Sequence, residues 1–400
     1  MNDISALEQS GVPESLSPRE AKLFRRAKDL APLIEREAAA SEAGRTLSPV
    51  LVEAFRDSEL FWLCVPEEFG GGGGAGLAGT VQILEEVTRA DGSAGWTLMA
   101  NTGAVAIAAS FLGPKAFDTV FGGSERPIMA GMLGPAGKSV QVSGGYQAGG
   151  KFQFGSGAAH ANWMAAGMLV MEEGKPRMLP SGLPEVRICF MPKDKVKMLD
   201  GWNVTGLVGT GSFDYEVPDQ FVPDDFTMER TSTAPERGRS AGIAVYGSAG
   251  HASIALGLMK RALQEVVQIA TEKKRPGYNT VLAKNDLFRN EFSVNEATYQ
   301  ATRDYVLHVF SDCDATLLSG SPLSPEQCAR ARQCNTWAHR NGADVVRFAH
   351  QWCGAQAVRT PTDMGRVSND MAVATNHIFV DRVTLTDAAG PIIETWLRRR

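Results

Sequence analysis

A serine placed between two glycines is the first residue of the sequence whose surroundings favour chemistry. The triplet Gly155-Ser156-Gly157 follows an alternating segment that starts at Gly144 and predicts a β-hairpin, and His160 comes three residues later. Flanking glycines let the backbone and the hydroxyl group approach a large, flat ligand closely. A serine between glycines is also typical of an ordinary turn. The motif alone therefore leaves a ligand contact and a simple turn both open.

A histidine near the C-terminal end, His377, is the second candidate. An imidazole exchanges protons close to neutral pH, which suits it to general acid or base catalysis. Most polar groups near a protein core are simply hydrogen-bonded to their neighbours, so a structural role for His377 is the alternative. The residue type by itself does not separate these two roles.

Composition and charge exclude several classes of function. The chain has 400 residues and a formal net charge of −5, and its basic cluster Arg398-Arg399-Arg400 is too small to predict a nucleic-acid surface. No signal peptide or membrane span is expected, because the apolar run Ala100–Leu112 is too short. Six cysteines without CxxC pairs indicate reduced thiols, no metal site and a cytoplasmic protein.

A formal G-x-G-x-x-G motif is formed by Gly71, Gly73 and Gly76. Such a motif binds a dinucleotide when it follows a buried strand and opens a βαβ unit. Neither condition holds here, so we interpret the run as a loop between helices. The chain is therefore not expected to bind NAD(P)H itself.

Helices are expected to support these residues from the N-terminal side, in a domain of residues 1–127. The capping box Ser17-Pro18-Arg19-Glu20 starts the first helix, which continues to about residue 40. Further helices are predicted from Ser48, at Ala78–Arg89 and at Ser93–Leu112. The small residues of the last of these helices allow close packing.

Strands are expected next, in a small antiparallel domain of residues 128–235. Short alternating runs lie between Gly, Pro and Asp turns at Ser139–Val142, Lys151–Phe154, Met164–Met171, Val186–Met191 and Ser212–Val217. The polar segment Glu229–Ser240 is interpreted as a linker.

A helical bundle is expected in residues 236–400. Helices are predicted from Ala241, at Asp286–Phe310, from the capping box at Ser324 to about Gln351, and at Asp370–Val380. Four helices joined by modest loops favour a four-helix bundle.

This plan, and several motifs along the chain, resemble the acyl-CoA dehydrogenase fold. The motifs are Val65-Pro66-Glu67-Glu68-Phe69-Gly70-Gly71, Glu85-Glu86, Asp91-Gly92-Ser93, Asp200-Gly201-Trp202, Gly206–Ser212 and Phe221-Val222-Pro223. The resemblance implies an α+β protein that is mostly α, with a helical N-terminal domain, a middle β-domain and a C-terminal four-helix bundle. It also implies a homotetramer.

A narrower resemblance connects the chain to flavin-dependent monooxygenases of this fold. Gly144-Gly145-Tyr146, Gly150-Lys151-Phe152 and Ser156–Trp163 are similar to that branch, although Lys151-Phe152 stands where the group commonly has Arg-Trp. His377 stands where many acyl-CoA dehydrogenases carry a glutamate base, and Asn369 replaces the usual Arg before Asp370.

This branch implies the oxygenase component of a two-component system that hydroxylates an aromatic or related small molecule. Reduced FMN or FAD and O2 are the implied cofactor and co-substrate, acting through a C4a-(hydro)peroxyflavin, and a separate NAD(P)H:flavin reductase is the implied partner. Ser156 at flavin N5 and His377 near C4a are the implied catalytic residues.

The resemblance also implies which other residues contact the cofactor and the substrate. The implied cofactor contacts are Leu133, Gly137, Phe152, Ser156, Gly157, Arg275, Gly354 and Gln356, and the implied substrate contacts are Trp96, Asn101 and His160. A structural role is the alternative for His160, helix packing for Asn101, and a solvated helix end for Arg275.

Two other functions stay open at this point. One is an acyl-CoA dehydrogenase whose base has moved to another helix, with Glu265 or Glu296 projecting into the site. The other is a non-catalytic protein that binds flavin or an aromatic ligand.

Overall fold

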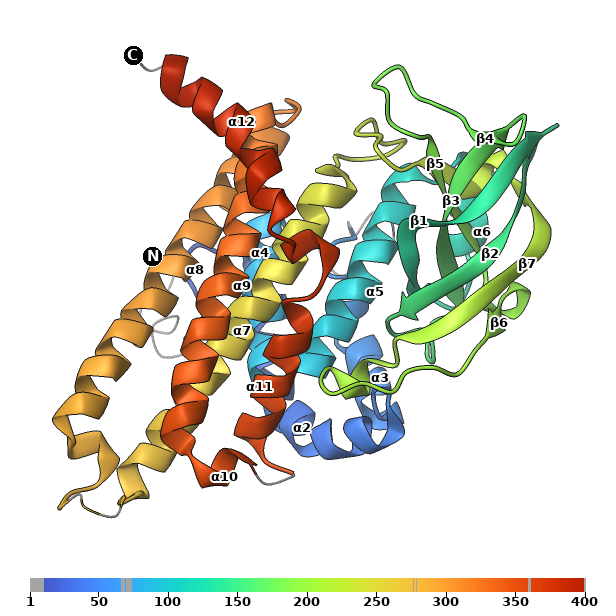
Figure 1. Ribbon diagram of the computed structural model, residues 1–400. Helices are drawn as coiled ribbons and strands as arrows, with labels where there is room; N and C mark the ends of the chain where they lie inside the picture. The colour runs from blue at the N-terminus through green and yellow to red at the C-terminus, as the bar shows by residue number, and fades with distance from the viewer. Residues whose placement is uncertain are drawn as a thin grey trace.

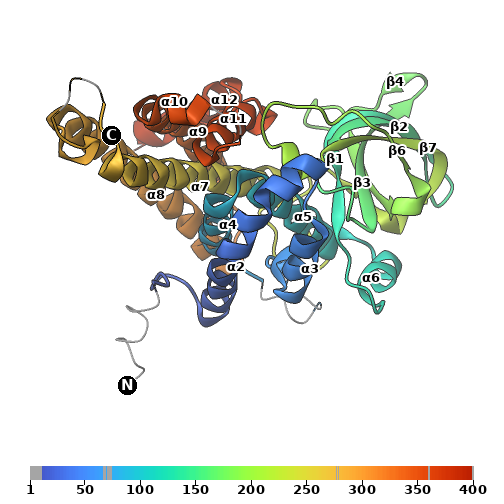
Figure 2. The ribbon, with the colours of Figure 1, turned by 90° about the horizontal axis from the view of Figure 1, so that it is seen from below.

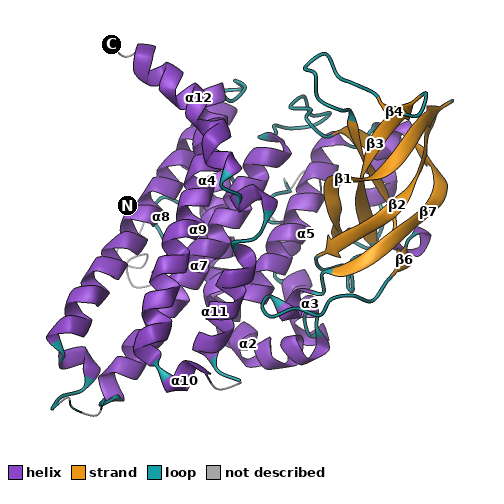
Figure 3. Ribbon diagram, viewed as in Figure 1, coloured by secondary structure: helices purple, strands orange, loops and turns teal. Residues whose placement is uncertain are grey.

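The computed structural model describes residues 11–65, 69, 74–275, 277, 279–358 and 361–398. Within the described residues, helices come before and after a middle region of strands, as Figure 1 and Figure 3 show. The predicted class, α+β and mostly α, is confirmed. Gly71 and Gly73 of the glycine motif, the Pro66-Glu67-Glu68 part of the first family motif, and Arg399-Arg400 lie outside the described residues.

The N-terminal helices begin where capping residues predict. Ser17 accepts a hydrogen bond from the backbone of Glu20, whose carboxylate accepts from the Ser17 backbone, so the predicted capping box is present. Asp91 caps the helix that carries Trp96, because its carboxylate accepts from Ala94 N at 2.8 Å. The elements are α2 (Pro18–Gly44), α3 (Pro49–Asp57), η1 (Leu60–Trp62), α4 (Leu77–Ala90), α5 (Gly92–Phe111) and α6 (Pro114–Phe121).

The strands of the middle region curl around one another beside the end of α5 (Figure 1). They are β1 (Met129–Val142), β2 (Gly145–Gly155), β3 (Trp163–Glu172), β4 (Lys175–Pro176), β5 (Val186–Pro192), β6 (Lys197–Met198), β7 (Phe213–Pro223) and β8 (Thr227–Glu229). The strands pair in the order β6-β7-β2-β1-β3-β5-β8, and β4 pairs with β3. Short 3-10 turns lie at Lys193–Lys195 (η3), Val208–Thr210 (η4) and Asp224–Phe226 (η5).

The prediction of a purely antiparallel sheet is wrong for one pair of strands. β1 and β3 run parallel, with Met129 beside Trp163, whereas the other pairs of strands are antiparallel. β2 runs back along β1 and ends beside the start of β1. The turn at residues 156–162 then crosses to the far side of β1, so β3 begins where β1 begins. This crossing turn is the segment that holds Ser156.

The C-terminal region contains three long helices and several short ones. They are α7 (Gly242–Glu272), η6 (Leu282–Lys284), α8 (Asp286–Leu318), α9 (Pro325–Cys353), α10 (Ala355–Val358), α11 (Asp363–Ala374), η7 (Ile378–Val380) and α12 (Val383–Arg398). The chain changes from helices to strands near residue 128 and back to helices near residue 240. These changes lie close to the predicted domain limits, and the exact limits stay predictions.

The predicted helix Asp370–Val380 is wrong in its extent, because α11 ends at Ala374. The hydroxyl of Thr375 and the side-chain amide of Asn376 both donate to the carbonyl of Ala372, at 2.9 and 2.6 Å. Side chains that bind the last carbonyls of a helix compete with its continuation. His377 therefore has an extended backbone and precedes the short turn η7 instead of lying in a helix.

The helix α7 is the centre of the helical part, between α4 and α9 (Figure 2). Its Gly257 lies so close to α4 that a Cβ atom there would be 2.4 Å from Cβ of Thr88. Among the described helices, α7 alone is long and apolar enough to cross a membrane, and 83% of its apolar window is buried inside the protein. Burial of this kind is usual for a core helix, so the composition of α7 is weak evidence for a span.

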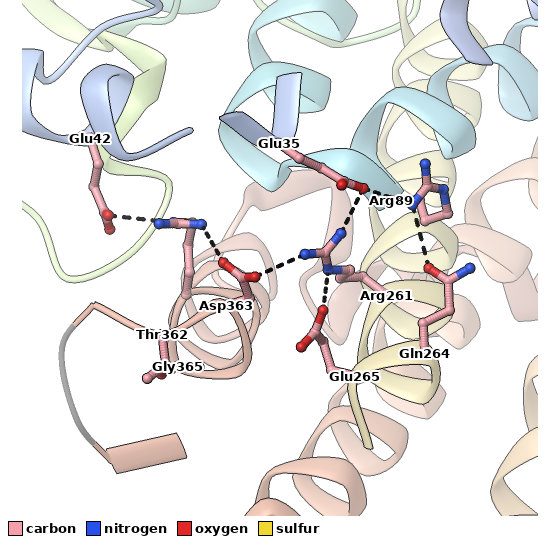
Figure 4. A network of polar contacts seen from close by, with 10 residues as sticks. Glu35, Glu42, Arg89, Arg261, Gln264, Glu265, Thr362, Asp363 and Gly365 are labelled. Atoms are coloured by element: carbon pink, nitrogen blue, oxygen red, sulfur yellow. Dashed lines mark hydrogen bonds and ion pairs between the residues drawn. The ribbon is translucent and has the colours of Figure 1, made fainter. Parts of the chain in front are cut away.

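Ion pairs join the helices along the C-terminal half of α7. Arg261 of α7 contacts Glu35 at 2.8 Å, Asp363 at 3.1 Å and Glu265 at 2.8 Å, as Figure 4 shows. Arg89 of α4 also contacts Glu35, at 3.1 Å. The network therefore connects α2, α4, α7 and α11, and it uses the carboxylate of Glu265.

Candidate active site

Ser156 lies in the crossing turn between β2 and β3, at the junction of the sheet with α5. The indole Nε1 of Trp96 donates a hydrogen bond to its hydroxyl oxygen at 3.1 Å. The same hydroxyl contacts the hydroxyl of Ser212 at 2.7 Å, and Ser212 contacts the hydroxyl of Thr210 at 2.7 Å. We call Thr210, Ser212 and Ser156 the hydroxyl chain. All three are buried, and Ser156 is 7% exposed.

The crossing turn needs a glycine at position 157. Gly157 has a φ of +77°, and a Cβ atom there would lie 2.4 Å from the amide oxygen of Asn101. Its N–H donates to the carbonyl of Thr210 at 2.9 Å, which joins the crossing turn to the segment before β7. A left-handed backbone with no room for a side chain is a position that favours glycine strongly. The glycine after Ser156 therefore shapes the turn.

Asn101 and His160 hold the crossing turn in place. The amide nitrogen of Asn101 donates to the carbonyl of Ser156 at 3.2 Å and to that of Met129 at 2.7 Å. Nε2 of His160 lies 3.0 Å from the amide oxygen of Asn101. Burial, followed by the charges of Arg56 and Lys193, lowers the pKa of His160 to about 3. These contacts favour the structural alternative for both residues over a substrate contact.

Three histidines from different elements meet beside Trp96, and we call His251, His339 and His377 the histidine cluster. The rings of His251 of α7 and His377 are stacked with centroids 4.0 Å apart. The ring of Trp96 makes T-shaped contacts with both rings, with centroids 4.9 Å from that of His251 and 5.6 Å from that of His377. The ring of His339 of α9 lies 6.5 Å from that of His251. Trp96 therefore connects the hydroxyl chain to the histidine cluster.

The protonation of His377 follows from its contacts. The backbone N–H of Phe379 donates to Nδ1 of His377 at 3.3 Å, so the proton of the neutral ring is on Nε2. Burial lowers the pKa of His377 to about 4. Burial also lowers the pKa of His339 to about 4 and that of His251 well below its usual value. At neutral pH, His377 is therefore an uncharged imidazole that can donate a hydrogen bond from Nε2.

The aromatic side chain that faces outward near Ser156 is Phe154. The ring of Phe152, the predicted flavin wall, is 1% exposed and stacks on Tyr215 at 5.0 Å inside the sheet. Phe154 is 55% exposed and has a φ of +63°. The pairing of β2 with β7 shifts register between Phe152 and Gly155, and a bulge of this kind re-aims a side chain.

Leu133 and Gly137 lie where β1 departs from regular pairing with β3. The register shifts twice between residues 132 and 137, so this part of β1 bulges out of the sheet. The carbonyl of Leu133 accepts a hydrogen bond from Nε of Arg230 at 3.0 Å. A Cβ atom at Gly137 would lie 2.3 Å from Sδ of Met168, so this approach depends on the glycine. The bulge and the outer part of β2, including Phe154, line a groove of about 520 Å³.

The other predicted cofactor residues meet at the far end of α7. Nη2 of Arg275 donates to the carbonyls of Gln351 and Trp352, each at 3.0 Å. Gly354 has a φ of +57° and ends α9, and Gln356 lines a separate hollow of about 370 Å³. The structure therefore brings Arg275, Gly354 and Gln356 together.

This second group lies far from the histidine cluster of the same chain. Arg275 follows the end of α7, whereas His251 is near its start. At a rise of 1.5 Å per residue, the part of α7 between His251 and Glu272 alone spans about 30 Å. The predicted cofactor residues of one chain thus form two separate groups.

Four residues of the site were given no role from the sequence. His251 lies in a helical stretch of small residues, which predicts only a core helix. His339 lies inside a long capped helix. Ser212 and Thr210 belong to a family motif, but no spacing along the chain shows that they contact Ser156. The one usable signal in the sequence was a histidine on an otherwise apolar helix face.

Asp370 binds the segment next to Thr210, at one end of the hydroxyl chain. Its carboxylate accepts a hydrogen bond from Leu207 N at 2.5 Å, and the hydroxyl of Thr210 donates to the carbonyl of Leu207 at 2.8 Å. Asp370 is 2% exposed. Burial, followed by the charge of Asp91, raises the pKa of Asp370 to about 8.

Two family models match the chain. One, described as the acyl-CoA dehydrogenase N-terminal domain, covers residues 25–115. The other, described as the acyl-CoA dehydrogenase C-terminal domain, covers residues 249–382. The second model includes the histidine cluster.

Relatives with similar sequences extend over most of the chain. An indole-3-acetate monooxygenase from Pseudomonas putida is 26% identical over 351 residues, which is 86% of this chain and 87% of that protein. The oxygenase subunit of a flavin-dependent monooxygenase from Rhodococcus jostii (strain RHA1) is 25% identical over 365 residues, which is 88% of this chain and 93% of that protein.

A solved structure, XiaF from Streptomyces sp. in complex with FADH2 and glycerol, has the same fold. It superposes with a TM-score of 0.84 and 20% sequence identity, and the match covers 94% of this chain and 96% of that chain.

The stability of the protein should depend on pH through Asp370. The folded state raises the pKa of this carboxyl to about 8, so its contribution to stability is fully present below pH 4 and is lost as the pH rises to 8. Asp370→Asn keeps an oxygen for Leu207 N and cannot ionise. Between pH 5 and 7, wild-type unfolding free energy should therefore fall relative to this variant by up to about 1.4 kcal/mol per pH unit.

Urea unfolding at several pH values measures this difference. The matched control is Asp344→Asn, because Asp344 is an exposed residue. Parallel pH profiles for the wild type and Asp370→Asn would show that Asp370 is ionised in the folded protein.

Proposed function

The chain belongs to the acyl-CoA dehydrogenase superfamily, as its motifs predicted, and we propose that it is the oxygenase component of a two-component flavin-dependent monooxygenase. It would use reduced flavin and O2 to hydroxylate an aromatic or related small molecule. The observation that carries the proposal is the uncharged imidazole of His377, with its proton on Nε2, joined through Trp96 to Ser156. The names of the relatives support the same reaction class.

The residues around Ser156 fit a flat cofactor. The bulge of β1 near Leu133, the outward ring of Phe154 and the hydroxyl of Ser156 would hold reduced FMN or FAD, with Ser156 at N5 of the ring system. When bound, the flavin supplies the activation of O2. XiaF, which shares the fold, was solved with FADH2.

His377 would donate a hydrogen bond to the negative charge that develops in the reaction. Its Nε2–H is a donor in a buried site where a hydrogen bond to developing negative charge is worth about 3 kcal/mol. Burial lowers the pKa of His377 and keeps its ring uncharged at neutral pH. The Nε2–H group therefore carries no full positive charge that would repel cations or attract anions before the reaction. The aromatic rings of Trp96 and Phe379 both pack against the imidazole.

The rival functions have less support in the structure. Glu265 pairs with Arg261 in the network of Figure 4, and Glu296 on α8 accepts a hydrogen bond from Gln300 at 2.7 Å. An acyl-CoA dehydrogenase would need one of these carboxylates beside the flavin.

The six free cysteines agree with a cytoplasmic location, which cell fractionation would test.

Electrons should come from a separate reductase. We expect the purified chain to oxidise no NADH or NADPH by itself. An unrelated NAD(P)H:flavin reductase, added with FMN or FAD, should restore hydroxylation of a phenol or indole, because only the reduced flavin has to reach the site. Product analysis and NADH absorbance measure both expectations. Rapid NADH oxidation by the pure chain would contradict the proposal.

A homotetramer would complete the cofactor site. The group at Arg275 follows the end of α7, which spans about 30 Å from His251 to Glu272, farther than one flavin nucleotide reaches, so it would serve a second copy. Exposed apolar residues on α12, Ile393, Trp396 and Leu397, are 56%, 64% and 62% exposed and agree with an interface. Light scattering should give four times the mass of the chain, and a monodisperse monomer would contradict the assembly.

Ser156 and His377 should act on the same step after flavin has bound. His377→Ala should lower product formation about 100-fold, because a positioned hydrogen-bond donor to developing negative charge is lost. Ser156→Ala should divert oxygen to hydrogen peroxide. Each should change reduced-flavin affinity less than about tenfold, and the double variant should lose less than the two effects combined.

Oxygen uptake, hydrogen peroxide and product measured together separate these effects. The control is His308→Ala, because His308 is exposed on α8. Loss of flavin binding and a lowered melting temperature in both variants would support the structural alternative instead. Two folded variants that use oxygen as efficiently as the wild type would remove both residues from the mechanism.

A further inference from the structure

The hydroxyl chain is held between two groups that have only one possible role in a hydrogen bond. At one end, the indole N–H of Trp96 can only donate, and it lies 3.1 Å from Oγ of Ser156. At the other end, the carbonyl of Leu207 can only accept, and it lies 2.8 Å from Oγ1 of Thr210. The direction of each bond between these ends follows from them.

The single proton of the Thr210 hydroxyl is used on the Leu207 carbonyl. In the bond between Thr210 and Ser212, at 2.7 Å, Ser212 must therefore be the donor. The proton of Ser212 is then used as well. In the bond between Ser212 and Ser156, also at 2.7 Å, Ser156 must be the donor. All the hydroxyl protons thus point away from Trp96 and toward Leu207.

This order leaves Ser156 with one free lone pair and no free proton. A serine hydroxyl has one donor and two acceptor positions. Ser212 takes the donor, and the indole N–H of Trp96 takes one acceptor position. Any further group at Oγ of Ser156 must therefore donate a hydrogen bond to it.

The surroundings keep this order from reversing. Thr210 is 0% exposed and Ser212 is 1% exposed, so water does not replace their partners. Gly209 N donates to the hydroxyl of Ser93 at 3.2 Å, and Leu207 N donates to Asp370, which fixes the segment that carries Thr210. Reversal would leave the Leu207 carbonyl without the Thr210 donor, and buried groups without partners are disfavoured.

We propose that Ser212 and Thr210 are positioning residues that make Ser156 a dedicated acceptor, so that the site selects reduced flavin over oxidised flavin. Reduced flavin carries a hydrogen on N5, whereas N5 of oxidised flavin has only a lone pair. An acceptor-only Ser156 fits the first and opposes the second. This inference rests on the proposed function, because it assumes that flavin N5 lies at Ser156.

Disrupting the fixed direction of the hydrogen bonds in the hydroxyl chain should reduce the preference for reduced flavin over oxidised flavin. In Ser212→Ala, the Ser156 proton has no partner and can turn toward N5 of oxidised flavin. In Thr210→Val, Ser212 can donate to Ser156 instead, which frees the Ser156 proton in the same way. In both variants, the dissociation constant of oxidised flavin divided by that of reduced flavin should fall at least tenfold. A tenfold fall in this ratio lowers the two-electron midpoint potential of the bound flavin by about 30 mV.

The measurement is a titration of the full chain with FMN and with FAD, in air for the oxidised forms and without oxygen for the reduced forms. Thr210→Ser keeps the hydroxyl and should keep the wild-type ratio. Thr97→Val is the packing control, because the Thr97 hydroxyl is buried, follows Trp96 in the sequence and has no hydrogen-bond partner among the described residues. Melting temperatures confirm that each variant is folded.

The outcomes separate this inference from the proposed function. A wild type that binds neither form of FMN or FAD would overturn both. A wild type that prefers reduced flavin, with folded Ser212→Ala and Thr210→Val variants that keep the same ratio, would overturn only the role of the hydroxyl chain. An equal loss in Thr97→Val would show a packing effect and would also overturn it.

Discussion

The hydrogen bond from the indole of Trp96 to Ser156 is the contact on which the rest of the site depends. It crosses from α5 to the turn between β2 and β3, and so joins the helical part to the sheet. The ring of Trp96 also packs against His251 and His377. One side chain therefore contacts both the serine and the imidazole. The glycine at 157 and the amide of Asn101 hold the serine to meet it.

Features that depend on neighbouring residues in the chain could be predicted from the sequence. Ser17 and Ser324 predict where their helices start, because a capping box is a local arrangement of four residues. The order of helices, strands and helices follows from the change in hydrophobic period. Ser156, Trp96 and His377 could be selected through their resemblance to a family, and the structure places them together.

Features that depend on contacts between distant segments could not be predicted. The parallel pairing of β1 with β3 is set by where β2 ends, and the outward turn of Phe154 by a bulge against β7. His377 lies outside a helix because two side chains compete for the carbonyl of Ala372. His251 becomes part of the site only when α7 meets the segment after α11.

The stacked rings of His251 and His377 are too close for both imidazoles to be positively charged at once. Two positive charges about 4 Å apart repel by about 4 kcal/mol even with partial screening, which is roughly three pKa units. If one ring becomes charged, the other stays neutral throughout the physiological range. The pair can therefore carry at most one positive charge, and because burial already lowers both pKa values, both rings are uncharged at neutral pH.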